Sequence, residues 1–103
     1  MKDVHEIDSL EQVRLLSDPL KLKLLQLFAT EPRTTREAAD KLGEGITKLY
    51  RHVDALREAG LLEIVDEERK RGTVERRFGA VARRFEVDRD LFSDSGDAAG
   101  REL

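Results

Sequence analysis

Apolar residues recur at helical spacing in the first third of the chain and predict two helices there. Ser9 opens a capping box before a short helix of residues 10–16, with Leu10, Val13 and Leu16 on one side. Asp18 caps a longer helix of residues 19–29, whose first residue is a proline. The wide apolar stripe of this second helix indicates a central place in the core. The stripe comprises Leu20, Leu22, Leu24, Leu25, Leu27 and Phe28.

A second pair of helices follows, joined by a short glycine-containing turn. Thr34 and Glu37 form another capping box before a helix of about eight residues, which the Gly-Glu-Gly sequence at 43–45 ends. The next helix is predicted over residues 46–59, with Gly60 as the left-handed residue that closes it. A short helix, a three-residue turn and a longer helix are typical of a helix-turn-helix motif.

After the fourth helix the apolar period changes to the alternation of β-strands. Two strands are predicted at 62–65 and 73–78, with residues 67–72 at or near the tip of the hairpin between them. A bulge or a strand end is expected at Gly79-Ala80. A hairpin directly after a helix-turn-helix supplies a wing. The expected fold class is therefore mostly α with a β-hairpin wing, a winged helix-turn-helix, and a short C-terminal helix stays open.

Composition supports one compact domain. Of the 103 residues, 39% are hydrophobic, which suffices for one modest core. No apolar run approaches the roughly 20 residues of a membrane helix, and the first residues lack the apolar stretch of a secretion signal. With no cysteine in the chain, these features predict a cytoplasmic protein. We expect residues 1–87 to form the domain and 88–103 an acidic C-terminal tail, partly helical or disordered.

The net charge of −3 conceals an uneven distribution along the chain. Residues 33–84 carry 13 basic and 10 acidic side chains, whereas residues 85–103 carry 2 basic and 6 acidic ones. The basic excess therefore falls on the helix-turn-helix and the hairpin. Local charge of this sign favours contact with a polyanion.

The second helix of the motif is predicted to turn polar and basic residues away from the core. At 100° per residue, Arg51 points almost opposite the core side, flanked by Thr47 and Lys48, with Tyr50 and His52 at the borders. These side chains can bond base edges and phosphates. A charged outer face alone is more typical of a solvated helix, and its combination with the turn and a basic hairpin favours DNA binding. The predicted core side consists of Ile46, Leu49, Val53 and Leu56.

Four segments in order resemble ArsR-like winged-helix transcriptional regulators: LSDPLKLKLL at 16–25, TREAADKLG at 35–43, TKLYRHVDAL with EAGLL at 47–62, and RGTVERRF at 71–78. The resemblance covers roughly Leu10 to Val87. It implies a homodimer that binds an inverted repeat in double-stranded DNA and regulates transcription. The DNA-binding residues that it implies are Thr35 and Arg36 at phosphate, Thr47, Lys48, Tyr50, Arg51 and His52 in the recognition helix, and Arg69, Lys70 and Arg71 in the wing.

Other functions find less support in the sequence. With no cysteine and only two histidines, His5 and His52, we predict no metal site, no cofactor and no catalytic site. A small-molecule effector stays open. The alternative function is a winged-helix module for protein–protein interaction without specific DNA binding, which the negative net charge favours. The expected dimer interface comprises Val13, Leu16, Phe85 and Phe92, apolar residues that a small domain would struggle to cover.

Overall fold

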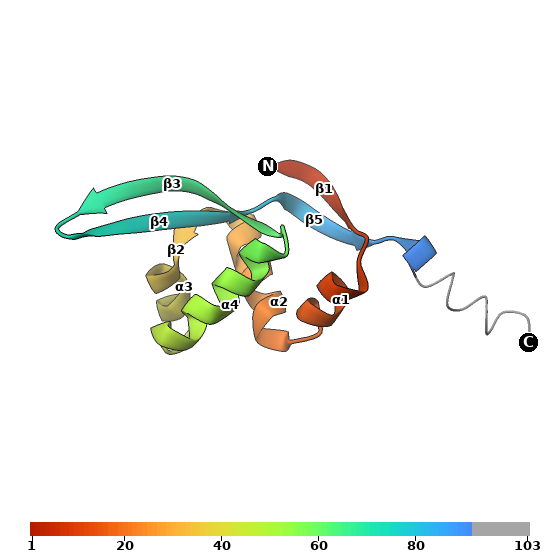
Figure 1. Ribbon diagram of the computed structural model, residues 1–103, viewed down its shortest axis with the longest axis horizontal. Coiled ribbons are helices and arrows are strands. Elements are labelled where there is room, and N and C mark those ends of the chain that lie inside the picture. Colours follow the sequence, from red (N-terminus) through yellow and green to blue (C-terminus); the bar gives the residue numbers. More distant parts are fainter. Residues whose placement is uncertain (92–103) are drawn as a thin grey trace, which may run out of the picture.

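A computed structural model describes residues 1–91 as four helices and five strands (Figure 1). The helices lie together on one side of the strands, and a long hairpin projects beyond them. None of the described helices has the length and apolarity needed to span a membrane. In chain order the elements are β1 (Lys2–Ile7), α1 (Leu10–Leu16), α2 (Pro19–Thr30), β2 (Arg33–Thr34), α3 (Thr35–Leu42), α4 (Ile46–Glu58), β3 (Leu62–Lys70), β4 (Thr73–Ala80) and β5 (Ala82–Val87).

Helix α2 begins as predicted, and most of its predicted stripe lies in the core. The Asp18 carboxylate accepts a hydrogen bond from the Leu20 backbone N–H at 2.9 Å, and Pro19 occupies the first turn. The prediction for Leu22 was wrong, because this side chain is 40% exposed. Leu22 lies at the edge of the stripe, where no described element covers it fully. The buried residues of α2 are Leu24, Leu25 and Phe28.

The capping box predicted at Ser9 forms only in part. The Ser9 hydroxyl accepts from the Gln12 backbone N–H at 3.1 Å, as expected of an N-cap. The Gln12 side chain does not return this bond to Ser9. Its Nε2 donates instead to the Ala59 carbonyl at 2.8 Å, which ties α1 to the end of α4.

The helix-turn-helix pair α3–α4 begins and ends at predicted residues, and a predicted glycine ends its first helix. The Thr34 hydroxyl accepts from the Glu37 N–H at 3.0 Å, and the Glu37 carboxylate accepts from the Thr34 N–H at 2.9 Å, which completes the capping box. Gly43 closes α3 in the left-handed conformation with φ +66°, and Gly60 closes α4 with φ +81°. A side chain with a Cβ rarely adopts such angles, so both helices end where the glycines stand.

The hairpin of β3 and β4, which we call the wing, is longer than predicted. Both strands run almost to the turn, so residues 67–70 belong to paired strand and only Arg71 and Gly72 form the tip. The predicted tip of 67–72 was therefore too wide. Opposite charges extend the pairing outward, since the Arg76 Nε donates to the Glu67 carboxylate across the strands at 2.9 Å.

The wing contains one irregularity, on the strand opposite to the one expected. The register shifts between Ile64 and Asp66 of β3, so the bulge lies there and not at Gly79-Ala80. Strand β4 does end at Ala80, which was the other expectation. A bulge increases the local twist, and this one lies where the wing leaves the body of the protein.

The pairing of β1 with β5 was not predicted. Residues Lys2–Ile7 lie parallel to Ala82–Val87 in a two-stranded sheet, and Ile7 is only 1% exposed. The expected order of four helices and two strands was therefore incomplete. Residues 89–91 are helical, while Phe92 and the rest of the predicted tail lie outside the described residues.

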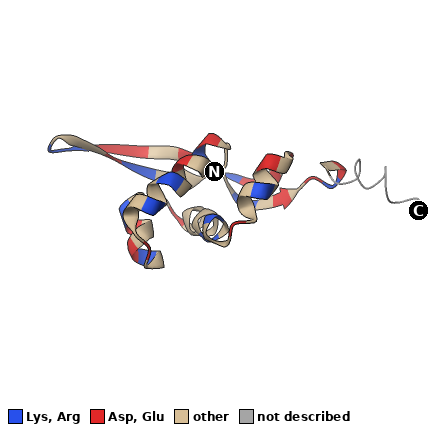
Figure 2. Ribbon diagram, turned by 60° about the horizontal axis from the view of Figure 1, so that its bottom comes forward, with Lys and Arg blue, Asp and Glu red and all other residues tan. Residues whose placement is uncertain are grey.

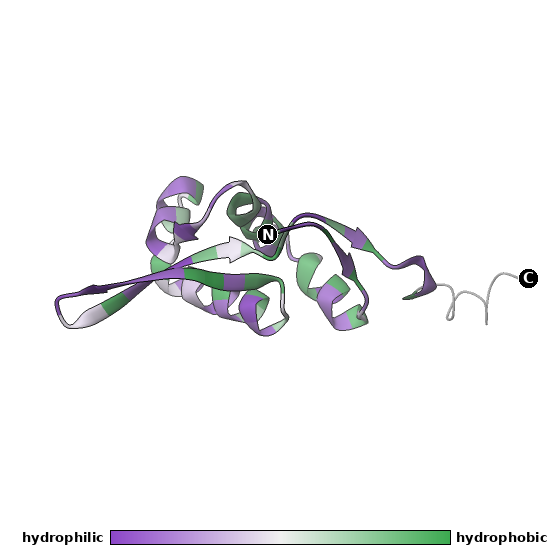
Figure 3. Ribbon diagram, turned by 90° about the horizontal axis from the view of Figure 1, so that it is seen from above, coloured by the Kyte–Doolittle hydropathy of each residue, from purple (hydrophilic) through white to green (hydrophobic). Residues whose placement is uncertain are grey.

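The core lies between the helices and the inner ends of the strands. Apolar colouring concentrates on these facing sides, whereas the outer wing is mainly hydrophilic (Figure 3). The rings of Phe28 and Phe78 meet edge to face with centroids 6.3 Å apart. Short strand β2 pairs with β4 and so attaches the start of α3 to the base of the wing. The buried cluster comprises Ile7, Leu24, Leu25, Phe28, Ala38, Ala39, Leu49, Val53, Leu56, Leu61, Leu62, Phe78 and Ala80.

The carboxylate of Glu37 is expected to make the free energy of unfolding depend on pH in the acid range. The hydrogen bond from the Thr34 N–H, aided by Arg77 and Arg33, lowers the pKa of Glu37 below its usual value of 4.5. A depressed pKa in the folded state gives stability that is present above about pH 4.5 and is lost as the pH falls through the lower value. We therefore expect the free energy of unfolding of wild type to exceed that of Glu37→Gln at pH 7, and the difference to shrink as the pH falls to 3. Chemical unfolding of both proteins across this pH range measures the difference.

Glutamine can still accept the capping hydrogen bond, so this substitution isolates the charge. Glu63→Gln serves as the control, because Glu63 is exposed and belongs to no ion pair within residues 1–91. A difference between wild type and Glu37→Gln that stays constant across this pH range would contradict the prediction.

Candidate nucleic-acid interface

Helix α4 turns the predicted side chains outward. Thr47, Lys48, Tyr50 and Arg51 are exposed, whereas His52 is half-buried. The opposite side is buried through Leu49, Val53 and Leu56, as predicted, and Ile46 packs against the core from the first turn. The first two turns of α4 therefore present a hydroxyl, two cations and a phenol to solvent.

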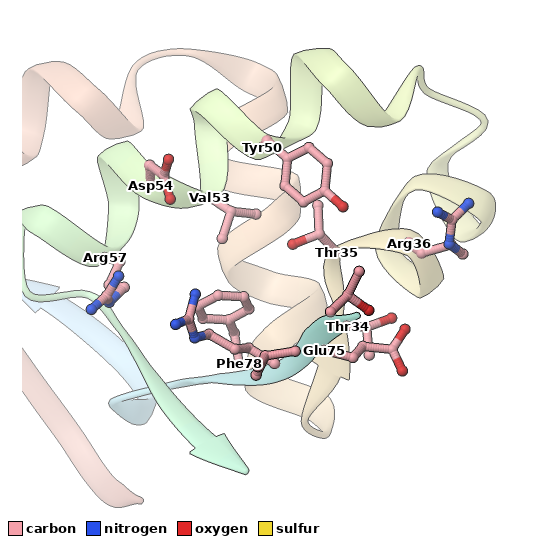
Figure 4. A pocket seen from close by; sticks show the side chains of 12 residues that line it. Thr34, Thr35, Arg36, Tyr50, Val53, Asp54, Arg57, Glu75 and Phe78 are labelled. Atoms are coloured by element: carbon pink, nitrogen blue, oxygen red, sulfur yellow. The ribbon is translucent and has the colours of Figure 1, made fainter. Parts of the chain in front are cut away.

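Thr35 and Arg36, the two residues at the start of α3 that were expected to contact phosphate, differ in burial. Thr35 is 4% exposed, which argues against contact through its hydroxyl. The Tyr50 ring points toward Thr35 across the space between the two helices (Figure 4). Arg36 is exposed and points away from that space. Of the two, Arg36 is the side chain that can reach an external anion.

A groove of about 290 Å³ separates α4 from β4 of the wing. Tyr50, Asp54 and Arg57 line it from α4, and Arg76 lines it from the wing. Arg57 and Arg76 were not among the predicted site residues. Both could have been found by periodicity: Tyr50, Asp54 and Arg57 share one flank of a helix, and Arg76 lies two residues before the inward-pointing Phe78, on the same face of its strand.

The three basic residues predicted for the wing differ in whether a carboxylate lies close enough to pair with them. Lys70 lies 3.1 Å from the Glu75 carboxylate and 4.0 Å from that of Glu68. The hydrogen bond to Glu75 and the two negative charges raise the pKa of Lys70. Arg69 and Arg71 are exposed and have no ion pair within the described part of the chain.

Basic and acidic side chains alternate over this region. Lys and Arg recur along α4 and the wing with Asp and Glu between them (Figure 2). On α4 itself the N-terminal half carries Lys48 and Arg51, while Asp54 and Glu58 lie toward the C-terminal end. With Arg57 also in the last turn, the N-terminal half of α4 carries two cations, and the remainder carries two carboxylates and one cation.

His52 is the one half-buried titratable group on the exposed side of α4. Burial, with a further effect of Lys21 and Lys48, lowers the pKa of His52 below its usual value of 6.5. Its Nδ1 atom is buried without a hydrogen-bond partner. At neutral pH the ring is therefore uncharged, and it can act as a donor only through one nitrogen.

Three of the four residues predicted for dimerisation fall within the described part of the chain. Val13, Leu16 and Phe85 are partly buried and pack against the core. Leu16 and Phe85 also line an apolar hollow of about 590 Å³ between α2 and β5, with the exposed Leu22 and Val87 at the same place. Phe92 lies outside the described residues.

Residues 1–91 contain no group of three or more His, Cys, Asp or Glu side chains arranged to hold a metal ion. Two carboxylates close to the first turns of α4 are engaged with lysines, since Glu44 lies 3.3 Å from Lys48 and Asp18 lies 3.3 Å from Lys21. The chemistry offered by this surface is therefore the binding of anions by cations and hydrogen-bond donors.

Comparison with known families identifies the central part of the chain. Residues 16–65 match a family described as a helix-turn-helix domain. This segment spans α2, α3 and α4 and ends within β3. No curated protein matches the chain. The central part of the chain is thus similar to a helix-turn-helix domain, and with the β3–β4 hairpin as its wing the fold of the described residues is a winged helix-turn-helix.

Proposed function

We propose that the protein is a transcriptional regulator that binds a specific sequence of double-stranded DNA. One observation carries this proposal. The cationic N-terminal half of α4 is uncovered within the described structure, and it projects beside a wing whose Arg69 and Arg71 are free of ion pairs. A helix and a hairpin with this arrangement suit a major groove and its adjacent phosphates.

In the proposed complex, the first two turns of α4 enter the major groove. Arg51 is centrally placed on the exposed side and can form a bidentate pair with guanine, while Thr47 and Lys48 reach neighbouring bases or phosphates. Asp54 and Glu58 would be repelled by phosphates if the whole helix lay flat in the groove. The charge gradient along α4 therefore favours insertion by the N-terminal end.

We further propose that two copies act together on an inverted repeat. The apolar hollow between α2 and β5, with Leu22 at 40% and Val87 at 47% exposure, gives each copy a surface that is better covered by protein than by water. Leu16 and Phe85 line the same hollow, which supports a place for both at the proposed dimer interface. A symmetric pair then presents two recognition helices to one face of the duplex.

Selection from a random duplex library tests the function and the symmetry together. Purified protein should enrich one sequence made of two inverted half-sites, whose centres lie about 10–10.5 base pairs or a multiple of this apart. Enrichment of one half-site alone would contradict the dimer. Failure to enrich any sequence would contradict specific DNA binding and favour the protein-interaction alternative.

The two free arginines of the wing are expected to strengthen binding to any DNA sequence. Replacing Arg69 and Arg71 together with glutamine should weaken binding to the selected and to a shuffled duplex by a similar factor. The slope of log K against log salt should become shallower by about 0.9 for each lost phosphate contact. Fluorescence anisotropy at several salt concentrations measures both quantities.

Lys70→Gln is the matched control for the wing, because its ammonium group is already paired with Glu75 and Glu68. Its effect on the binding free energy should be smaller than half the effect of the arginine pair. An equal loss for Lys70→Gln, or a loss confined to the selected sequence for the arginine pair, would refute the proposed role of the wing.

A further inference from the structure

We propose that a basic hollow between α2 and α4 binds one phosphate of the DNA backbone, and that Lys21 is a DNA-contacting residue. The hollow has a volume of about 540 Å³. This inference rests on the proposed DNA-binding function and adds a contact from a helix outside the helix-turn-helix pair. The residues that line the hollow are Lys21, Thr47, Lys48, Arg51 and His52.

The position of the hollow on α4 is the first argument. One flank of α4, through Tyr50 and Arg57, lines the groove beside the wing. The hollow lies on the other flank, where Lys48 and His52 face Lys21 of α2. A major groove is bounded by a phosphate backbone on each side. When α4 enters the groove, the wing meets one backbone and the basic hollow meets the other.

The chemistry of the hollow is the second argument. It brings Lys21 and Lys48 together as cations for the phosphate, while Arg51, the proposed base contact, also lines it and has no ion pair within the described residues. Lys21 and Lys48 each have one carboxylate at 3.3 Å, Asp18 and Glu44 respectively. The side chain of Lys21 is 18% exposed, lines the hollow, and is positioned by the ion pair of its ammonium group with Asp18. Thr47 and His52 add hydrogen-bond donors without adding charge.

The decisive test compares Lys21→Gln with Lys23→Gln in the full chain. Lys23 lies on the same helix, is exposed and does not line the hollow. On the duplex obtained by selection, Lys21→Gln should raise Kd about 3- to 10-fold and make the salt slope shallower by about 0.9, as expected for one lost phosphate contact. The ratio of specific to shuffled Kd should stay unchanged, because a phosphate contact carries no sequence information.

A second variant tests the same site through an expected gain in DNA affinity. Glu44→Gln frees Lys48 from its ion pair and should tighten binding to both duplexes by a few fold. Lys21→Arg should restore most of the affinity lost in Lys21→Gln. Since loss of folding cannot tighten binding, the gain in Glu44→Gln keeps the inference testable even if Lys21→Gln proves unstable.

The outcomes separate this inference from the proposed function. Wild type that binds no duplex overturns the DNA-binding proposal itself. Wild type that binds specifically, with Lys21→Gln and Lys23→Gln equal in Kd and salt slope, overturns only the phosphate site. Inorganic phosphate, added at constant ionic strength, is the probe for a site that binds a free anion and not DNA. If phosphate shifts the NMR signals of Lys21 while Lys21→Gln binds DNA as tightly as wild type, the inference is also overturned.

Discussion

Replacing Arg51 with alanine is expected to weaken binding to the selected DNA sequence by roughly 5- to 150-fold, which corresponds to the 1–3 kcal/mol typical of a bidentate contact to a base. Arg51 lies opposite the core side of α4 and is exposed, so the side chain is free to enter the groove. Binding to a shuffled duplex should fall much less. The measurement is fluorescence anisotropy with both duplexes at one salt concentration.

Arg14→Ala provides the control for loss of one positive charge, because Arg14 is exposed on α1, far along the chain from the helix-turn-helix. It should leave both affinities close to wild type. If Arg51→Ala weakened both duplexes by the same factor, Arg51 would be a phosphate contact and not a base contact. Unchanged affinity for the selected sequence would exclude α4 as the recognition helix.

Phe28→Ala is expected to produce the largest loss of stability, about 3–5 kcal/mol in the free energy of unfolding. Phe28 has no exposed surface, and its ring packs against that of Phe78 between α2 and the base of the wing. The cavity left by the ring would lie where the helices meet the sheet. Since small domains are stable by only about 5–15 kcal/mol, this loss takes a large share of the total.

Leu22→Ala is the matched control on the same helix, six residues earlier in α2. Its side chain is 40% exposed, and the expected loss is about 1 kcal/mol or less. Urea unfolding followed by circular dichroism measures both variants. Losses of similar size for the two would contradict the central place of Phe28 in the core.

The helical part of the fold could be predicted because its signals are local. Asp18 with Pro19, the Thr34–Glu37 capping box, and the glycines that follow α3 and α4 all act within a few residues. The core side of α4 followed from periodicity alone. Such features fix element boundaries before any long-range contact forms.

The elements that were missed depend on partners distant in the sequence. Residues Lys2–Ile7 form a strand only because β5 lies parallel to them some 80 residues later. A parallel pair needs a long crossover and leaves no turn residues to mark it. In the wing, cross-strand ion pairs extend the ladder through a stretch that is charged enough to be mistaken for a loop.

The candidate site was predicted in outline and refined by tertiary contacts. Exposure of Thr47, Lys48 and Arg51 followed from the helical period, whereas the burial of Thr35 follows from the packing of α3 beneath Tyr50. Lys21 was not among the predicted site residues either. The packing of α2 against α4 brings its side chain beside α4, and no local pattern encodes that approach.

The most direct test of the account is the ratio of affinities for the selected duplex and for a shuffled duplex of the same composition, measured at two salt concentrations. A sequence-specific regulator should bind the selected duplex about 10³-fold more tightly or better, and both affinities should fall steeply as salt rises. A ratio near one at both salt concentrations would contradict the account, because α4 would then read no sequence.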